Sequence, residues 1–283
     1  MKTVKIAGVP EHFNLPWHLA MEEAAFNQRG IDLQWQNVPE GTGKMCQMLG
    51  EGETDLAIIL TEGITKSIID GNPSNIVQEY IASPLHWGVH VSSNSAYYQL
   101  NDLRDKKAAI SRYGSGSHLM AFVLAQQKGW NQDSLQFEVV QHLDGAISAL
   151  EAGNADYFLW EHFTTKPLVD SRVFRWLGDC PTPWPCFVIA ASRDFIRNHG
   201  SVLNHILEII NLYTTEFKRI PSIDRTLANR YGQQLEDIVE WLGKTQWSQS
   251  QLSTHTLDNV IDTLFNLKLI NKKMNAEEII TNV

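Results

Sequence analysis

The segment of residues 110–130 places two glycines and several hydroxyls directly before an expected helix. Backbone N–H groups at a helix start lack intrahelical partners and carry the positive end of the helix dipole, so this segment favours an anionic or strongly polar group. Its spacing matches neither a P-loop, which needs a lysine after the second glycine, nor a dinucleotide fingerprint, which needs a third glycine. A serine N-cap with glycines that tighten the turn is the alternative. The residues expected to contact the anion are Ser111, Arg112, Gly114, Ser115, Gly116 and Ser117.

The elements that would position this loop occur twice in the chain. The motif L-x-x-G-x-x-D stands at residues 49–55 and again at 150–156, each time before an apolar run. Each copy is typical of a short helix that ends at a glycine, a polar turn that contains the aspartate, and a buried strand of a parallel sheet. Each copy also follows a strand, a glycine-containing loop and a helix. The duplication predicts an α/β protein with two lobes, each built on a doubly wound sheet.

The order of the elements predicts where the lobes begin and end. Apolar runs at 86–91 and 184–191 flank the second copy, and we expect them to cross between the lobes as a hinge. From residue 201 onward, apolar residues three and four apart predict helices. We therefore expect lobe 1 to comprise residues 1–89 and 186–283, with lobe 2 inserted as residues 90–185. The expected strands are 4–7, 31–35, 56–60, 75–81, 107–110, 137–140 and 157–160.

Ligands of open α/β sheets bind beyond the carboxyl ends of the strands, and this rule selects further candidates. Phe13 and Trp17 are as consistent with core or interlobe packing as with stacking on a ligand. Glu62 and Glu161 each follow a buried strand and could face the ligand or cap a helix, and Arg112 could instead form a surface ion pair. The candidates of lobe 1 are His12, Phe13, Asn14, Trp17, Gly41, Thr42, Gly43, Thr61, Glu62 and Ser83, and those added in lobe 2 are His142, Trp160 and Glu161.

Composition excludes several functional classes. The formal net charge of −9 argues against a nucleic-acid partner, which would need a basic face. The N-terminal residues contain no apolar segment of signal-peptide length, and no run reaches membrane-spanning length, so we expect a cytoplasmic protein unless a signal was removed. The three cysteines form no metal-type pair, which favours free thiols in a reducing compartment. No histidine pair has the spacing of a helical zinc site, so we expect no metal and no cofactor.

The chain resembles the type 2 periplasmic-binding-protein fold, in the branch shared by ABC-transporter substrate-binding proteins for sulfonates, nitrate and taurine and by thiamine-pyrimidine biosynthesis proteins. The segments that carry the resemblance are 41–63, 102–110, 111–118, 145–161 and 257–270. The resemblance implies that two lobes close on a hinge over one small molecule. It also implies an ABC-transporter permease as a partner if the protein is exported, and a monomer.

We expect a non-catalytic binding protein for a small polar, anionic metabolite such as a carboxylate, sulfonate or phosphate ester. The alternative is an enzyme on the same fold, related to thiamine-pyrimidine or menaquinone biosynthesis. The thiamine-pyrimidine enzymes resemble one another in a cysteine-rich iron motif, whereas residues 180–186 of this chain read CPTPWPC and lack the dense cluster. No nucleophile and base stand at a recognisable spacing, although such pairs can assemble in space.

Overall fold

The computed structural model describes residues 1–282 and divides the chain into two compact units. Unit 1 comprises residues 1–83 and 184–283, and unit 2 comprises residues 84–183. The expected second lobe begins at residue 90, six residues later than unit 2. The difference arises because the strand β5 (His86–Ser92) pairs along its whole length within the sheet of unit 2.

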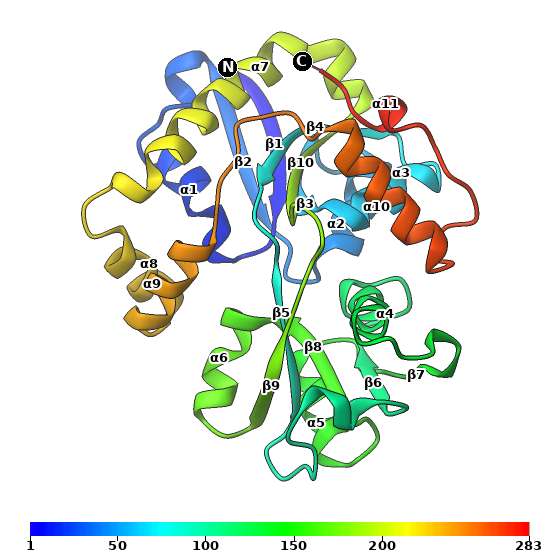
Figure 1. The fold of residues 1–283 in the computed structure, drawn as a ribbon. Helices are drawn as coiled ribbons and strands as arrows, with labels where there is room; N and C mark the ends of the chain where they lie inside the picture. Colours follow the sequence, from blue (N-terminus) through cyan, green and yellow to red (C-terminus); the bar gives the residue numbers. More distant parts are fainter. Residues whose placement is uncertain (283) are drawn as a thin grey trace. The chain divides into compact units, whose positions relative to one another are not determined.

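Unit 1 is built on a five-stranded sheet with the order β2-β1-β3-β10-β4. Strand β1 is parallel to β2 and β3, and β10 is antiparallel to β3 and β4. Helices α1 and α7 lie on one face of this sheet, and α2, α3 and α10 lie on the other (Figure 1). The strands are β1 (Lys2–Gly8), β2 (Ile31–Asn37), β3 (Leu56–Leu60), β4 (Ser74–Ile81) and β10 (Phe187–Ser192). The helices are α1 (Leu15–Glu22), α2 (Thr42–Glu51), α3 (Thr61–Ile69), α7 (Arg193–Glu216), α8 (Ile223–Tyr231), α9 (Leu235–Lys244), α10 (Thr254–Asn266) and α11 (Ala276–Ile279), with 3-10 turns at His12–Asn14, Asn27–Arg29 and Phe217–Arg219.

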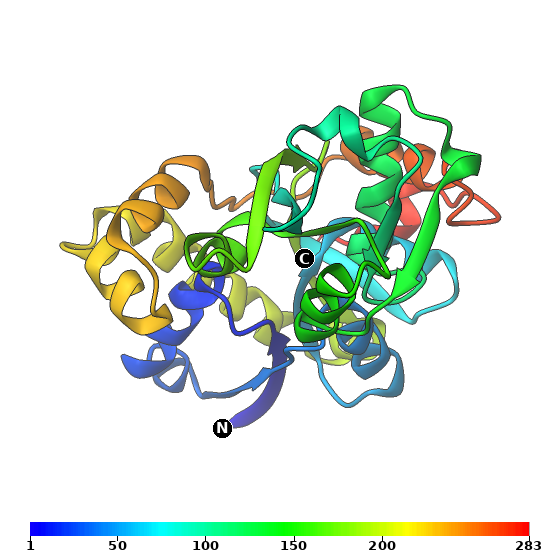
Figure 2. The ribbon, with the colours of Figure 1, turned by 90° about the horizontal axis from the view of Figure 1, so that it is seen from below.

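Unit 2 repeats this design with the strand order β7-β6-β8-β5-β9. Strand β6 is parallel to β7 and β8, and β5 is antiparallel to β8 and β9. Helices α5 and α6 lie on one face of the sheet (Figure 2). Their apolar residues join a buried cluster that includes Phe158 and Phe174. The remaining strands are β6 (Lys107–Ile110), β7 (Gln136–Val139), β8 (Tyr157–Glu161) and β9 (Phe174–Pro181). The helices are α4 (Gly116–Lys128), α5 (Leu143–Glu151) and α6 (His162–Asp170), with 3-10 turns at Leu100–Leu103 and Gln132–Ser134.

The two sheets confirm the expected α/β fold class. In each sheet the fourth strand in spatial order is the one antiparallel strand, and in each case the chain enters it directly after leaving the other unit. The seven expected strands are present within a few residues of their predicted bounds. Strand β9 was missed because its sequence, FRWLGDCP, contains an arginine, a glycine and an aspartate and shows no clear alternation.

The duplicated aspartates hold β1 and β3 of unit 1, and β6 and β8 of unit 2, in register. Asp55 Oδ2 accepts a hydrogen bond from Lys5 N at 2.8 Å, and Asp156 Oδ2 accepts one from Lys107 N at 2.8 Å. The aspartate N–H donates in return to the carbonyl of the same lysine, at 3.0 Å in unit 1 and 2.8 Å in unit 2. Each pair of bonds fixes where β3 or β8 begins relative to its neighbour, so these aspartates are structural turn residues.

Two further expectations concern the cysteines and the membrane. Cys46, Cys180 and Cys186 are all free thiols and all buried, and burial raises the pKa of Cys180 to about 12. Such a thiol stays protonated and unreactive at neutral pH. Among the helices of residues 1–282, none has the length and apolar character needed to cross a membrane.

Replacement of either duplicated aspartate by alanine should destabilise the protein. Asp55→Ala and Asp156→Ala each remove a charged acceptor from a strand N–H, and we expect each to lower the free energy of unfolding by about 1 to 3 kcal/mol. Asparagine at the same positions retains an acceptor oxygen and should restore much of the loss. Urea denaturation measures the effect, with Asp258→Ala at an exposed position of α10 as the control. Alanine variants as stable as this control would contradict the assigned role.

Candidate functional site

The starts of α2 and α3 lie side by side at the carboxyl edge of the sheet of unit 1. A Cβ atom on Gly63 would lie 2.2 Å from Cγ2 of Thr42, so only glycine allows this approach. Thr61, the first residue of α3, is fully buried, and its Oγ1 donates to the carbonyl of Pro185 at 2.5 Å. The predicted residues Thr42, Thr61 and Glu62 are therefore brought together, with Gly43 on the first turn of α2.

Glu62 is a buried carboxyl group on the first turn of α3. Its side chain is 2 % exposed, and Oε2 accepts a hydrogen bond from Trp184 Nε1 at 2.8 Å. Oε1 has no hydrogen-bond partner anywhere in residues 1–282. Burial raises the pKa of Glu62 to about 7, against the opposing effects of hydrogen bonds from its own backbone and from Trp184. Glu62 can therefore exchange a proton near neutral pH.

An aromatic cluster lies beside the same edge. Phe13 packs against Phe187, the first residue of β10, at a ring distance of 5.1 Å, and against Trp241 at the same distance. The backbone carbonyl of Phe13 accepts a hydrogen bond from Tyr80 Oη at 2.7 Å. His12 is 1 % exposed and lies 4.1 Å from the Trp241 ring, and burial lowers the pKa of its imidazole to about 3. His12 is thus a neutral ring within the apolar cluster.

Four other predicted residues of unit 1 belong to the core, to a helix cap or to hydrogen bonds with the backbone. Trp17 is fully buried and stacks on Phe26 at 6.0 Å, which corresponds to the core alternative rather than to a ligand wall. Asn14 is also fully buried, and its Nδ2 donates to Val9 O at 2.9 Å. Gly41 is the N-cap of α2, with a φ of 77° that favours glycine, and Ser83 Oγ accepts a hydrogen bond from Gln246 N at 3.0 Å.

In unit 2, three serine hydroxyls gather at the end of β6 and the start of α4. Ser117 is 1 % exposed, and its Oγ accepts a hydrogen bond from Ser111 N at 2.9 Å. The same oxygen lies 3.2 Å from Ser111 Oγ and 3.1 Å from Ser115 Oγ. The N-cap of α4 is Ser115, whose Oγ accepts from His118 N at 3.4 Å. The predicted serines therefore form one connected group of hydroxyls.

The backbone amides of this loop are only partly available to a ligand. Gly114 N donates to His118 Nδ1 at 3.1 Å, and Ser115 N donates to Arg112 O at 3.1 Å. Within the described chain, no hydrogen bond engages the N–H groups of Gly116 or Ser117. The expectation that every amide of the loop serves the anion is therefore too broad. The Arg112 side chain is exposed beside this loop.

The remaining predicted residues of unit 2 belong to helix caps and packing. Glu161 is the N-cap of α6, and its Oε2 accepts hydrogen bonds from the N–H and hydroxyl of Thr164, both at 2.7 Å. Burial raises the pKa of Glu161 while these hydrogen bonds oppose the shift. His142 is the N-cap of α5 and exposed, with Nδ1 accepting from Gly145 N at 3.3 Å. Trp160 is half-buried and stacks on Phe158 at 5.3 Å.

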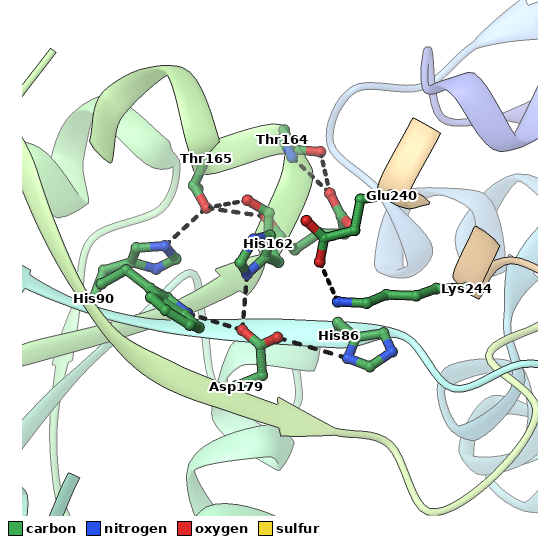
Figure 3. A network of polar contacts seen from close by, with 10 residues as sticks. His86, His90, His162, Thr164, Thr165, Asp179, Glu240 and Lys244 are labelled. Atoms are coloured by element: carbon green, nitrogen blue, oxygen red, sulfur yellow. Dashed lines mark hydrogen bonds and ion pairs between the residues drawn. The ribbon is translucent and has the colours of Figure 1, made fainter. Parts of the chain in front are cut away.

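A carboxylate between two imidazoles lies at the same edge of the sheet of unit 2 (Figure 3). Asp179 Oδ1 lies 2.8 Å from His162 Nδ1 and also accepts a hydrogen bond from Trp176 Nε1 at 2.8 Å, and Oδ2 lies 3.7 Å from His86 Nδ1. Burial opposes ionisation of Asp179, but these hydrogen bonds outweigh it and hold its pKa well below the ordinary value. The ionised carboxylate fixes the orientation and tautomer of His162.

His90 lies behind this cluster and shares a hydrogen bond of 2.9 Å with the hydroxyl of Thr165 on α6 (Figure 3). Burial lowers the pKa of His90 to about 4, and the nearby His162 adds to the shift. His90 is therefore a neutral group that ties β5 to α6. No set of three or more His, Cys, Asp or Glu side chains within the described residues is arranged to hold a metal ion.

Several residues of these edges were missed from the sequence. His86, His162 and Asp179 stand at three separate points in the chain, and only the pairing of β5 with β8 and β9 brings them to one edge. Asp179 could not be selected from the sequence because it lies on β9, a strand that the sequence pattern does not indicate. Trp184 lies in a run that was recognised as a crossing segment, but nothing local indicated that its indole would bond to Glu62.

Removal of the Glu62 charge should stabilise the protein in a pH-dependent manner. Because the folded-state pKa of about 7 exceeds the ordinary value of 4.5, the wild type should lose stability as pH rises from 4.5 to about 7. The Glu62→Gln variant avoids this loss and should be more stable by about 3 kcal/mol above pH 7, and nearly equal to the wild type below 4.5. Chemical denaturation at several pH values measures the difference. Glu236→Gln, at an exposed site, is the control, and a pH-independent difference for Glu62→Gln would contradict the assignment.

Comparisons with known proteins agree with this architecture. The family model described as Ca3427-like PBP matches residues 87–180. The Candida albicans CA3427 gene product, reported to define a family with the generic periplasmic-binding-protein fold, is 25% identical to the chain, with a TM-score of 0.90 over 100% of this chain and 97% of that one. No curated protein sequence matches the chain significantly.

Sulfonate-binding proteins share the fold at lower identity. The alkanesulfonate-binding protein SsuA from Xanthomonas axonopodis pv. citri, solved with bound MOPS, is 16% identical with a TM-score of 0.84, covering 100% of this chain and 99% of that one. The aliphatic sulphonate binding protein SsuA from Escherichia coli is 16% identical with a TM-score of 0.74, covering 100% and 94%. The chain therefore has the periplasmic-binding-protein fold.

Proposed function

We propose that the protein is a solute-binding protein for a small anionic metabolite, with sulfonates as the first class to test. The observation that carries the proposal is the start of α4. There, the free N–H groups of Gly116 and Ser117 stand beside the linked hydroxyls of Ser111, Ser115 and Ser117. Amides at a helix start favour negative charge, and hydroxyls can donate to the oxygens of a sulfonate, carboxylate or phosphate. The sulfonate-binding proteins of the same fold support this choice of class.

The carboxyl edge of the sheet of unit 1 carries its own group of polar and aromatic residues. The first turn of α2 and the carboxyl group of Glu62 lie close together, and Phe187, which packs against Phe13, pairs with the end of β3 just before Glu62. Delivery of the solute to an ABC-transporter permease belongs to this proposal if the protein acts outside the cytoplasm.

The enzyme alternative has less support. The pairing of His162 with Asp179 resembles the base and orienting group of many enzymes, but a base and its orienting group do not by themselves define a reaction. The contacts that the structure describes at this edge orient His162 without assigning it a substrate. We therefore take solute binding as the function to test first.

Replacement of Arg112 by alanine should weaken anion binding without destabilising the protein. A charge-assisted hydrogen bond is worth about 1.5 to 3 kcal/mol, so Kd for an alkanesulfonate should rise about tenfold to a hundredfold. Calorimetric titration with ethanesulfonate, MOPS and inorganic phosphate measures binding, and thermal melting measures stability. Because Arg112 is exposed, the melting temperature should not change.

The matched control is Arg104→Ala, which removes another exposed arginine of unit 2. Ser117→Ala should differ from both arginine variants, because loss of the buried acceptor for Ser111 N lowers stability as well as affinity. Equal affinity of the Arg112 and Arg104 variants would exclude Arg112 from the site. Failure of the wild type to bind any of the three anions would overturn the proposed function.

A further inference from the structure

We infer that His118 is a positioning residue for the proposed anion site of unit 2. Its neutral imidazole accepts the N–H of Gly114 and thereby holds the loop before α4 in the conformation that keeps the serine hydroxyls and the two free amides together. His118 acts through the loop and does not itself bind the solute. This inference rests on the proposed function and adds the residue that keeps its site assembled.

His118 joins the loop to the first turn of α4 by two hydrogen bonds. Its side-chain Nδ1 accepts from Gly114 N at 3.1 Å, and its backbone N donates to Ser115 Oγ at 3.4 Å. Between these bonds the chain turns, with Ser115 N donating to Arg112 O at 3.1 Å. Gly114 lies in the left-handed region, with a φ of 79°. Because glycine also adopts many other conformations, this one needs a constraint, which the bond to Nδ1 supplies.

The His118 ring is held in one orientation by three aromatic rings. Tyr113, Phe122 and Phe137 contact it edge-to-face, at ring distances of 5.3, 5.2 and 4.7 Å. They belong to the loop, to α4 and to β7, so three different elements fix the plane of the imidazole. His118 is 8 % exposed, and this burial lowers the pKa of its imidazole. A neutral imidazole whose Nδ1 accepts from Gly114 carries its proton on Nε2.

The loop that His118 holds carries the proposed anion contacts. Ser115 Oγ accepts from His118 N and lies 3.1 Å from Ser117 Oγ. Ser117 Oγ in turn accepts from Ser111 N at 2.9 Å. The free N–H groups of Gly116 and Ser117 follow Ser115 directly in the chain. Loss of the bond to Nδ1 would free the loop, and Ser115 would then leave this arrangement for part of the time.

The bond itself is measured in the protein without solute. Nitrogen NMR of the imidazole distinguishes the two neutral tautomers, and we expect His118 to carry its proton on Nε2 at neutral pH. The Gly114 amide should exchange at least about tenfold more slowly than in the unfolded chain. In His118→Phe, which keeps an aromatic ring and removes the acceptor, this protection should be lost. A proton on Nδ1, or the same protection of Gly114 in His118→Phe, would contradict the inference.

Two variants separate positioning from packing. His118→Phe retains a packed ring but has no acceptor, whereas His118→Asn retains an acceptor oxygen and loses the ring. The titrant is whichever of ethanesulfonate, MOPS and inorganic phosphate the wild type binds most tightly. We expect its Kd to rise about five- to tenfold in His118→Phe and to stay within about threefold of the wild type in His118→Asn. His118→Asn should nevertheless melt at the lower temperature, because it loses the buried ring. His255→Phe, at an exposed site of α10, is the control.

The outcomes separate this inference from the proposed function. A role in packing alone predicts the reverse order, with His118→Phe binding like the wild type and His118→Asn weakened, and that order would overturn the inference while anion binding stands. Affinity of His118→Asn no better than that of His118→Phe would overturn it as well. Should His118→Asn fail to fold, unchanged affinity of His118→Phe would still overturn the inference. Failure of the wild type to bind any of the three anions would overturn the proposed function and the inference with it.

Discussion

The hydrogen bonds that join the duplicated aspartates to β1 in unit 1 and to β6 in unit 2 determine where the helices after β3 and β8 begin. Asp55 and Asp156 each bind the backbone of a lysine on the neighbouring strand, and five-residue strands follow them at once. Because β3 and β8 pass into α3 and α6 without a connecting loop, fixing the start of the strand also fixes the start of the helix. The positions of Glu62 and His162 therefore follow from a contact at the opposite end of the strand.

The two units share one arrangement of strands but place different polar groups at the starts of their helices. At the start of α3, unit 1 presents a carboxyl group with one free oxygen, whereas unit 2 caps the equivalent helix with Glu161 and satisfies it internally. Unit 2 instead concentrates hydroxyls and free amides at the start of α4. Retaining an uncompensated Glu62 opposes folding above neutral pH, and stability of this kind is commonly sacrificed where a ligand must be bound.

Much of the fold could be predicted from the sequence because the signals are local. The L-x-x-G-x-x-D motif, the apolar runs and the helical periodicity each describe a few neighbouring residues, and together they defined two units and seven strands. The site was harder to predict because its contacts join distant residues. Glu62 was selected by its place after a strand, but its partner Trp184 is 122 residues away, and Asp179 depends on a strand that has no clear pattern. Trp17 is fully buried, and no local sequence pattern distinguishes a buried tryptophan from one that faces a ligand.

The most direct measurement is amide-resolved hydrogen exchange by NMR, with and without a saturating alkanesulfonate. The account places the anion on the N–H groups of Gly116 and Ser117, which have no partner in the described chain. Binding should slow exchange at these two amides by at least about tenfold. Amides at the opposite edge of the same sheet, such as that of Lys107, already bond to Asp156 and should not change. Unchanged exchange at Gly116 and Ser117 in the bound protein would contradict the central claim.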